Sequence, residues 1–121
     1  ARKMMTGGPL RWLSRWGIAA TDAGDVPVPP GAADGEGAPA DNARVAAYAS
    51  DLCDRVLASY RSGHFPVVIG GDHTVSIGSV AAAARWLREQ HGQAARLGLL
   101  WVDAHADLNT KDDMSVLGTR T

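Results

Sequence analysis

The second half of the chain alternates between two hydrophobic patterns. Continuous apolar runs predict two short buried strands, from Pro66 to Ile69 and from Leu97 to Val102. Between them, apolar residues recur at helical spacing, and Gly92 follows as a stop signal. The helical positions are Ile77, Val80, Ala81, Ala84 and Leu87. The order strand, helix, strand predicts a right-handed crossover between parallel strands.

A longer helix is predicted before the first of these strands. Its apolar stripe comprises Val45, Ala49, Leu52 and Val56. We expect Asp41 or Asn42 to cap its start, and we expect it to run to about Tyr60 and stop near Gly63.

The patterns are weaker towards the amino terminus. Residues 9–25 predict a short helix around Leu10, Trp12, Leu13 and Trp16, followed by a weak strand from Ile18 to Thr21. Residues 27–39 are rich in Pro, Gly and Ala and predict a loop. The length of 121 residues predicts one α/β domain over residues 1–121. Its roughly three predicted strands are fewer than a stable sheet normally uses.

Carboxylate, imidazole and carboxylate follow the second predicted strand at strict two-residue spacing. An extended backbone turns every second side chain to one face, so Asp103, His105 and Asp107 should converge. Hard oxygen donors with one imidazole suit Mn²⁺, and bridging carboxylates are the usual basis of two-metal sites. The competing interpretation is a solvated turn in which Asp103 caps the backbone and His105 merely packs. The triple spacing favours a manganese site with one ion or a pair.

A second polar group follows the first predicted strand. There, a Gly70-Gly71 turn carries Asp72 and His73 into the following helix. The turn lacks the spaced third glycine and the Lys-Ser/Thr of nucleotide loops, which argues against a phosphate site. Parallel strands end at the same sheet edge, so we expect His73 to lie beside the segment Asp103 to Asp107.

These two motifs resemble those of the ureohydrolases, the family of arginase, agmatinase and formiminoglutamase. Gly70-Gly71-Asp72-His73 and Asp103-Ala104-His105-Ala106-Asp107 are similar to the first two metal motifs of that family, in residues and in spacing. Upstream, Gly8-Pro9-Leu10-Arg11 and Gly24-Asp25-Val26-Pro27 look like the arginase lead-in. The resemblance implies a three-layer α-β-α fold with a parallel sheet, of which this chain holds only the amino-terminal part.

The resemblance also implies an activity. In that family, a binuclear manganese centre activates a hydroxide that attacks the guanidinium carbon of arginine, which gives ornithine and urea. By the same resemblance, His73 binds one ion and His105 the other, and Asp103 bridges the two. Asp107 binds metal and also orients the attacking oxygen, which makes it the expected catalytic residue.

The next residues bear on the substrate. Asp107-Leu108-Asn109-Thr110 resembles the arginase form of the motif, in which the Asn helps to hold the amino-acid end of arginine. Agmatinases commonly differ here, because their substrate lacks that carboxylate. Arginine is therefore the expected guanidino substrate, and agmatinase or another ureohydrolase is the alternative. The other interpretation of Asn109 is a simple turn residue.

The chain also departs from the arginase pattern. After Thr110 it lacks the Ser-Gly-Asn and His-Gly loops, and it contains neither the later segment with two aspartates that completes the metal ligands nor the acidic partner of the guanidinium. We therefore expect a fragment that is an incomplete catalyst by itself. A truncated remnant without catalysis is the alternative from a different functional class.

Composition narrows the expected setting. The chain is 45% hydrophobic and 21% charged, which is typical of a globular domain. Its net charge of -1 gives no excess of positive charge that would attract nucleic acid. No apolar run reaches membrane-spanning length and no signal peptide is visible, so we expect a cytoplasmic protein, and a homo-oligomer when full length. Cys53 stands alone in a helical pattern as a half-buried residue, and His64 and His91 are not expected to bind metal.

Overall fold

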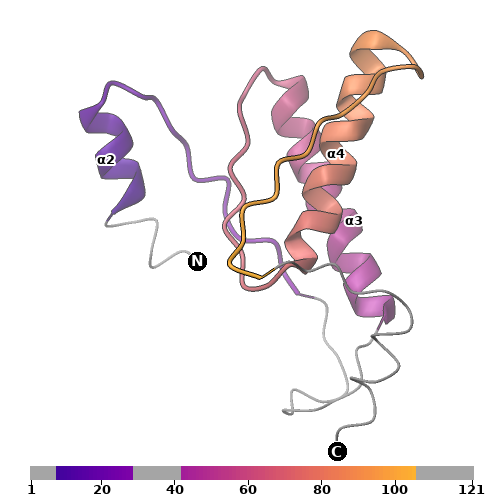
Figure 1. Cartoon of the computed structure of the whole chain (residues 1–121). Coiled ribbons are helices and arrows are strands. Elements are labelled where there is room, and N and C mark those ends of the chain that lie inside the picture. The colour runs from indigo at the N-terminus through magenta and orange to yellow at the C-terminus, as the bar shows by residue number, and fades with distance from the viewer. Residues whose placement is uncertain (1–7, 29–41, 106–121) are drawn as a thin grey trace, which may run out of the picture.

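The computed structural model describes residues 8–28 and 42–105 (Figure 1). These ranges contain three helices, α2 (Pro9–Arg15), α3 (Asn42–Arg61) and α4 (Thr74–His91). The two long helices confirm the prediction from apolar spacing, and both stop where glycine was expected to stop them. Gly63 has a φ of 74° and Gly92 a φ of 83°, a conformation that other residues rarely adopt.

The helices α3 and α4 pack against each other and form the core of the described chain. Leu52, Val56 and Leu57 of α3 are buried against Ala82 of α4. The close approach depends on Gly78, because a Cβ atom there would lie 2.6 Å from the carbonyl oxygen of Ala49. The apolar spacing in α3 therefore predicted its buried face, whereas α4 buries its small residues and leaves Ile77 exposed.

Aromatic and charged side chains join the same two helices near their carboxyl ends. Tyr60 stacks on Trp86 with ring centroids 5.0 Å apart and planes inclined by 20°. Beside this stack, Arg61 makes two contacts with Glu89, at 2.6 Å from Nη2 to Oε1 and 3.0 Å from Nε to Oε2. This pairing lowers the pKa of the Glu89 carboxyl, mainly through the hydrogen bond from Arg61.

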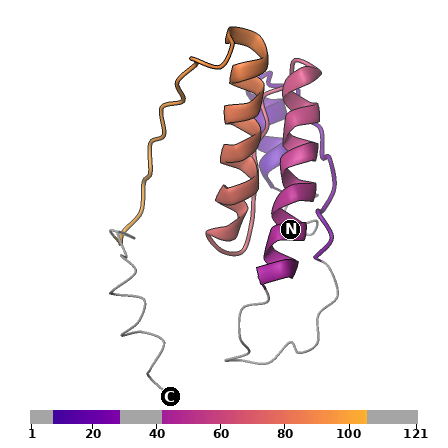
Figure 2. The ribbon, with the colours of Figure 1, turned by 90° about the vertical axis from the view of Figure 1, so that its right-hand side faces the viewer.

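The two long helices run in the same direction. The connection between them, residues 62–73, returns along their length before α4 begins, and residues 92–105 return in the same sense after α4 ends (Figures 1 and 2). The segments at 64–70 and 97–103 are therefore both extended and both lead to the end of the helix pair where α4 starts. This is the chain path that the predicted crossover requires.

The predicted strands themselves are wrong for the described part of the chain. Residues 18–21, 66–69 and 97–102 carry no strand assignment there. A strand exists only through hydrogen bonds to a neighbouring strand, and within the described residues no backbone hydrogen bond joins segment 97–103 to the segment that precedes α4. The parallel sheet of the expected α/β fold is accordingly not confirmed.

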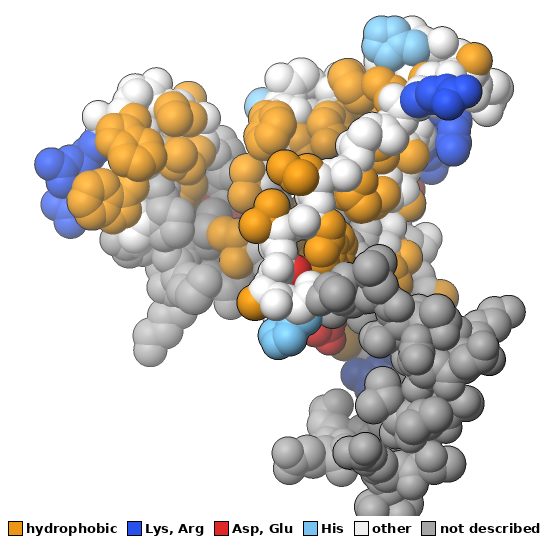
Figure 3. All heavy atoms as spheres, in the orientation of Figure 1, with side chains coloured by type: hydrophobic (Ala, Val, Ile, Leu, Met, Phe, Trp, Pro, Cys, Tyr) orange, Lys and Arg blue, Asp and Glu red, His pale blue; other side chains and the backbone are white. Residues whose placement is uncertain are grey.

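The apolar side chains of these segments are largely solvent-exposed. Phe65, Val67, Leu100 and Val102 are all strongly exposed, and Val102 reaches 88%. Figure 3 shows hydrophobic side chains along this face of the molecule. Burial of apolar surface drives folding, so these segments have the composition of buried strands without the neighbours that would bury them.

Helix α2 stands apart from the other two. Among the described helices, it packs against neither α3 nor α4, and Figure 1 shows it projecting to one side. Pro9 starts it, and the guanidinium of Arg15 lies 5.2 Å from the ring centroid of Trp12. The sequence predicted this short helix, and the structure confirms it.

No helix in the described ranges is long and apolar enough to span a membrane.

Candidate metal centre

The backbone of His73 is held by the turn that starts α4. The turn is tight, because a Cβ atom on Gly70 would clash with the side chain of Val75. Asp72 accepts hydrogen bonds at Oδ1 from the Thr74 hydroxyl and, at 2.9 Å, from the Thr74 backbone N–H. The His73 carbonyl accepts hydrogen bonds from the hydroxyl of Ser76 at 2.6 Å and from its backbone N–H at 3.0 Å.

Asp72 therefore acts as a cap for the first turn of α4, since its side chain satisfies a backbone N–H that has no partner within the helix. The two hydrogen bonds from Thr74, that of the hydroxyl first, lower the pKa of the Asp72 carboxyl below its ordinary value. This role of Asp72 was not predicted from the sequence. An Asp two residues before a Thr at the start of a helical pattern is a signal that could have indicated it.

The carboxylate of Asp103 lies between two imidazoles. Its Oδ2 atom is 3.5 Å from Nε2 of His73, and its Oδ1 atom is 3.2 Å from Nδ1 of His105. Oδ1 also accepts the backbone N–H of His105 at 2.7 Å. Each carboxylate oxygen thus faces a different histidine, one from the turn before α4 and one from the end of segment 97–105.

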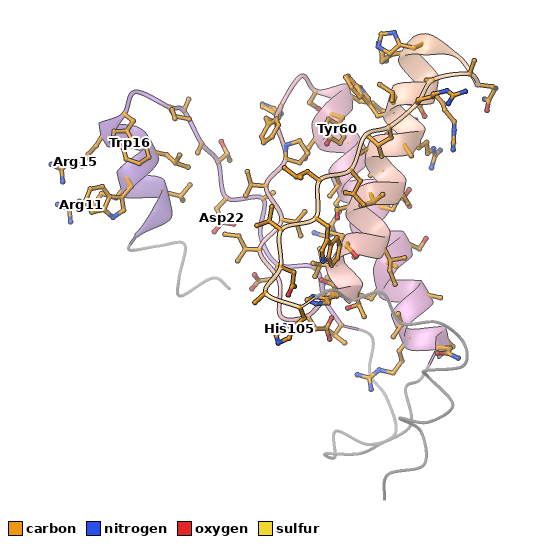
Figure 4. All side chains as sticks on the ribbon, in the orientation of Figure 1. Arg11, Arg15, Trp16, Asp22, Tyr60 and His105 are labelled. Carbon is orange, nitrogen blue, oxygen red and sulfur yellow. The ribbon has the colours of Figure 1, made fainter. Side chains whose placement is uncertain are left out.

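The electrostatics keep this carboxylate ionised. The backbone N–H of His105 lowers the pKa of Asp103 most, and the side chain of His105 and the charge of His73 act in the same direction. The side chain of Asp103 is only 18% exposed, whereas those of His73 and His105 are 63% and 85% exposed. The Asp103 side chain is thus the least exposed of the three, and it is flanked by two more exposed imidazoles. Figure 4 labels His105 at the lower end of its segment.

A depression of about 310 Å³ adjoins these groups. It is lined by Val68, Asp72, His73, Val75, Ser76, Ser79, Leu100, Trp101, Val102 and Asp103. The residues come from both extended segments and from the start of α4, so the depression lies where the predicted strand ends meet. In the same region, the ring of Trp101 contacts that of His73 edge-to-face, with centroids 5.4 Å apart and planes at 89°.

The structure brings together three of the predicted site residues, His73, Asp103 and His105, although the strands from which their meeting was predicted are not formed in the described chain. Asp107 and Asn109 lie outside the described residues. Within residues 8–28 and 42–105, no three donors surround one point closely enough to hold a single ion. The donors lie instead on the two sides of Asp103. His91 ends α4, at the opposite end of that helix from His73.

The chain is similar to known arginases over most of its length. The profile of the Arginase family matches residues 3–119, which is almost the whole chain. The arginase of Bacillus caldovelox is 33% identical over 114 residues, which cover 90% of this chain and 35% of that protein. The arginase of Emericella nidulans is 40% identical over 65 residues, or 54% of this chain and 19% of that enzyme. No solved structure matches significantly.

The chain therefore belongs to the arginase family. A third relative, the arginase of Staphylococcus aureus strain MRSA252, is 40% identical over 62 residues, which are 51% of this chain and 18% of that protein. The chain thus spans about a third or less of the length of these curated relatives.

Proposed function

We propose that this chain supplies one half of a binuclear manganese site that hydrolyses the guanidinium group of arginine to ornithine and urea. The observation that carries the proposal is the position of Asp103, with one oxygen facing His73 and the other facing His105. A carboxylate in this position could bridge two ions, with one imidazole ligand on each.

The donor types fit manganese. Two imidazoles and a carboxylate supply nitrogen and hard oxygen ligands, and no thiol takes part, since Cys53 lies within α3. Hydrogen bonds hold Asp103 in its ionised form, which is the form that binds cations. His73 would serve one ion and His105 the other, and Asp103 and Asp107 would add carboxylate oxygens.

Two bound Mn²⁺ ions would supply the positive charge that makes water a nucleophile near neutral pH and offsets negative charge on the reacting oxygen. The chain's own residues then have separate tasks. His73 and His105 must be neutral at the nitrogens that bind, and Asp103 must hold its two oxygens in opposite directions. Asp107 would orient the attacking water towards the guanidinium carbon. Asn109 would hold the amino-acid end of arginine and so fix that carbon in place.

We also propose that the protein is cytoplasmic and that it forms a homo-oligomer. A lone, half-buried cysteine suits a reducing cytoplasm, where disulfides are rare. Exposed apolar segments at 64–70 and 97–103 suit a longer polypeptide that buries them and assembles into a homo-oligomer.

The proposal is tested in a longer polypeptide that joins this chain to the part of the Bacillus caldovelox arginase that the chain does not match. We expect urea release from arginine that depends on added Mn²⁺. Asn109→Ala should narrow the ratio of kcat/KM for arginine over agmatine. The change should correspond to a free-energy difference of about 1–3 kcal/mol, the usual effect of losing one polar substrate contact.

A matched control is Asp51→Ala, which removes an exposed carboxylate that pairs with Arg55 on α3 and leaves the site intact. It should release urea at the rate of the unmodified polypeptide. A polypeptide that binds Mn²⁺ and prefers agmatine would contradict arginine as the substrate. An unchanged ratio in Asn109→Ala would reduce that residue to a turn former.

A further inference from the structure

We propose that a depression between the starts of α3 and α4 binds a small zwitterionic amino acid with an apolar side chain. Arg44 binds the carboxylate of this ligand, and Asp72 binds its ammonium group. The site needs no metal, so it goes beyond the proposed hydrolysis of arginine and is testable in the metal-free chain.

Three parts of the chain form this α3–α4 depression, which has a volume of about 310 Å³. Its lining includes Val28 from the segment after α2, Arg44, Val45 and Tyr48 from α3, and Asp72 and Val75 from the turn that starts α4. Ligand pockets begin at about 300 Å³, so the volume suits a small molecule. Asp72 and Val75 also line the depression beside the candidate metal centre, which makes the two depressions neighbours.

Three valines supply the apolar part of the lining. Val45 and Val75 are half-buried, and Val28 is 65% exposed. An aliphatic side chain placed against them would remove apolar surface from water on both partners, which is the main source of affinity in small-molecule sites. The lining therefore favours a ligand with an apolar body.

Asp72 is the negative side of the depression. The two hydrogen bonds that its carboxylate accepts from Thr74 both end on Oδ1, and within the described residues Oδ2 makes no hydrogen bond or ion pair. The same bonds lower the pKa of Asp72 and so keep it ionised. Oδ2 is therefore an anionic acceptor for an ammonium group, while Oδ1 continues to cap α4.

Arg44 is the positive side. It lies four residues before Tyr48, so the two side chains share one face of α3. Arg44 already takes part in an interaction within the chain. A guanidinium has five N–H donors, so Arg44 can bind a ligand carboxylate without giving up that interaction. The hydroxyl of Tyr48 adds a neutral donor on the same face.

Two opposite charges in one small depression discriminate between ligands. A molecule with a single charge is attracted by one of Arg44 and Asp72 and repelled by the other, and such repulsion is a common way of rejecting a competitor. A zwitterion matches both charges and has no net charge to be repelled. The valines then favour an apolar side chain over none.

The experiment titrates L-leucine into the unmodified 121-residue chain without metal. The reporters are the methyl resonances of Val45 and Val75 and the ring resonances of Tyr48. Three analogues each lack one part of leucine: isoamylamine lacks the carboxylate, isocaproate lacks the ammonium group, and glycine lacks the apolar side chain. Each analogue should bind about tenfold more weakly, the usual result of losing one contact with a charged group or one buried aliphatic group.

Two variants assign the charges. Arg44→Gln should weaken leucine binding about tenfold and should not weaken isoamylamine binding, because that ligand has no carboxylate. Asp72→Asn, which keeps an oxygen acceptor for the cap, should weaken leucine binding similarly and should not weaken isocaproate binding. The matched control Arg55→Gln removes the same charge from another turn of α3, where Arg55 pairs with Asp51, and should bind leucine like the unmodified chain. Circular dichroism checks that each variant keeps its helices.

We expect the three reporters to shift together with a single dissociation constant in the millimolar range, as is usual for a small ligand with few contacts. Reporters that stay unmoved throughout the leucine titration would overturn the site. Isoamylamine or isocaproate that binds as tightly as leucine would overturn the preference for a zwitterion, and so would full leucine affinity in a folded Arg44→Gln or Asp72→Asn variant. None of these results depends on Mn²⁺, so the proposed function stands or falls separately.

Discussion

The helix pair α3–α4 buries apolar side chains, whereas the two extended segments at 64–70 and 97–105 leave most of theirs exposed to solvent. Each helix satisfies its backbone hydrogen bonds internally and buries one face against the other, with Leu57 only 1% exposed. The segments have strand-like sequences, yet Val102 is 88% exposed and no ladder forms in the described chain. Asp103 and His105 lie on the second extended segment, and His73 lies in the turn between the first segment and α4. The buried core of the described chain is therefore helical, whereas the proposed site depends on segments that remain exposed.

The largest effect that we expect concerns catalysis by the 121-residue chain itself. With Mn²⁺ added, it should release urea from arginine at least a hundredfold more slowly than the longer polypeptide described above. In the described chain, segments 64–70 and 97–105 pair with no neighbouring strand, so the side chains that they carry are not held firmly in place. A misplacement of about 1 Å in a reacting group can already lower the rate about a hundredfold. The assay compares the chain with its Asp103→Ala variant as background. Metal-dependent turnover well above that background would show that the isolated half-site suffices.

The second prediction contrasts stability in the two regions. Leu57→Ala should lower the free energy of unfolding by about 2–5 kcal/mol, because it leaves a cavity between α3 and α4. Val102→Ala removes a side chain of similar type from an exposed position and should change stability by about 0.5 kcal/mol or less. Urea unfolding of both variants measures the difference. Equal losses would mean that segment 97–103 is buried in solution.

A smaller effect is expected at the link between the regions, where Asp72 caps α4. Its pKa is lowered in the folded chain, so its ionised form favours folding. This contribution is fully present above the ordinary carboxyl pKa of about 3.9 and is lost as the pH falls through the lower folded pKa. Asp72→Ala should cost about 0.5–2 kcal/mol at pH 7, and Asp72→Asn, which keeps an oxygen acceptor, should cost less.

Urea unfolding at neutral pH and at pH of about 2.5, below the ordinary carboxyl pKa, tests the sign. The difference in stability between the unmodified chain and Asp72→Ala should shrink at the lower pH, because below the ordinary carboxyl pKa the unfolded chain takes up a proton at Asp72, which the folded chain does only as the pH falls through its lower pKa. A difference that is the same at both pH values would show that the charge of Asp72 has no part in capping.

The sequence predicted what depends on neighbours along the chain. The apolar stripe ending at Val56 and the stop signals at Gly63 and Gly92 are local, and the structure confirms both helices that they define. The two-residue spacing of Asp103 and His105 is also local, and their side chains lie 3.2 Å apart. The approach of His73 to Asp103, at 3.5 Å, joins distant parts of the chain and does not follow from spacing alone.

What the sequence did not predict depends on contacts across space. The prediction of strands at 66–69 and 97–102 is wrong for the described chain, because a strand requires a partner strand that the described residues do not provide. Gly78 was missed as the point of closest helix approach, since its role depends on Ala49 and Leu52 of the other helix. The contact between Trp101 and His73 joins two segments that are distant in sequence, and no periodicity indicates it.

We propose that Asp103, whose two oxygens face His73 and His105, lies between two ion positions. The most direct test is calorimetric titration of the 121-residue chain with Mn²⁺, alongside Asp103→Ala, His105→Ala and the control Asp51→Ala. We expect measurable binding by the unmodified chain and by the control. We also expect a clearly greater loss of affinity in Asp103→Ala than in His105→Ala, because a bridging carboxylate binds both ions and the imidazole binds one. Equal losses in the two site variants would contradict a bridge, and undiminished binding by Asp103→Ala would contradict the site.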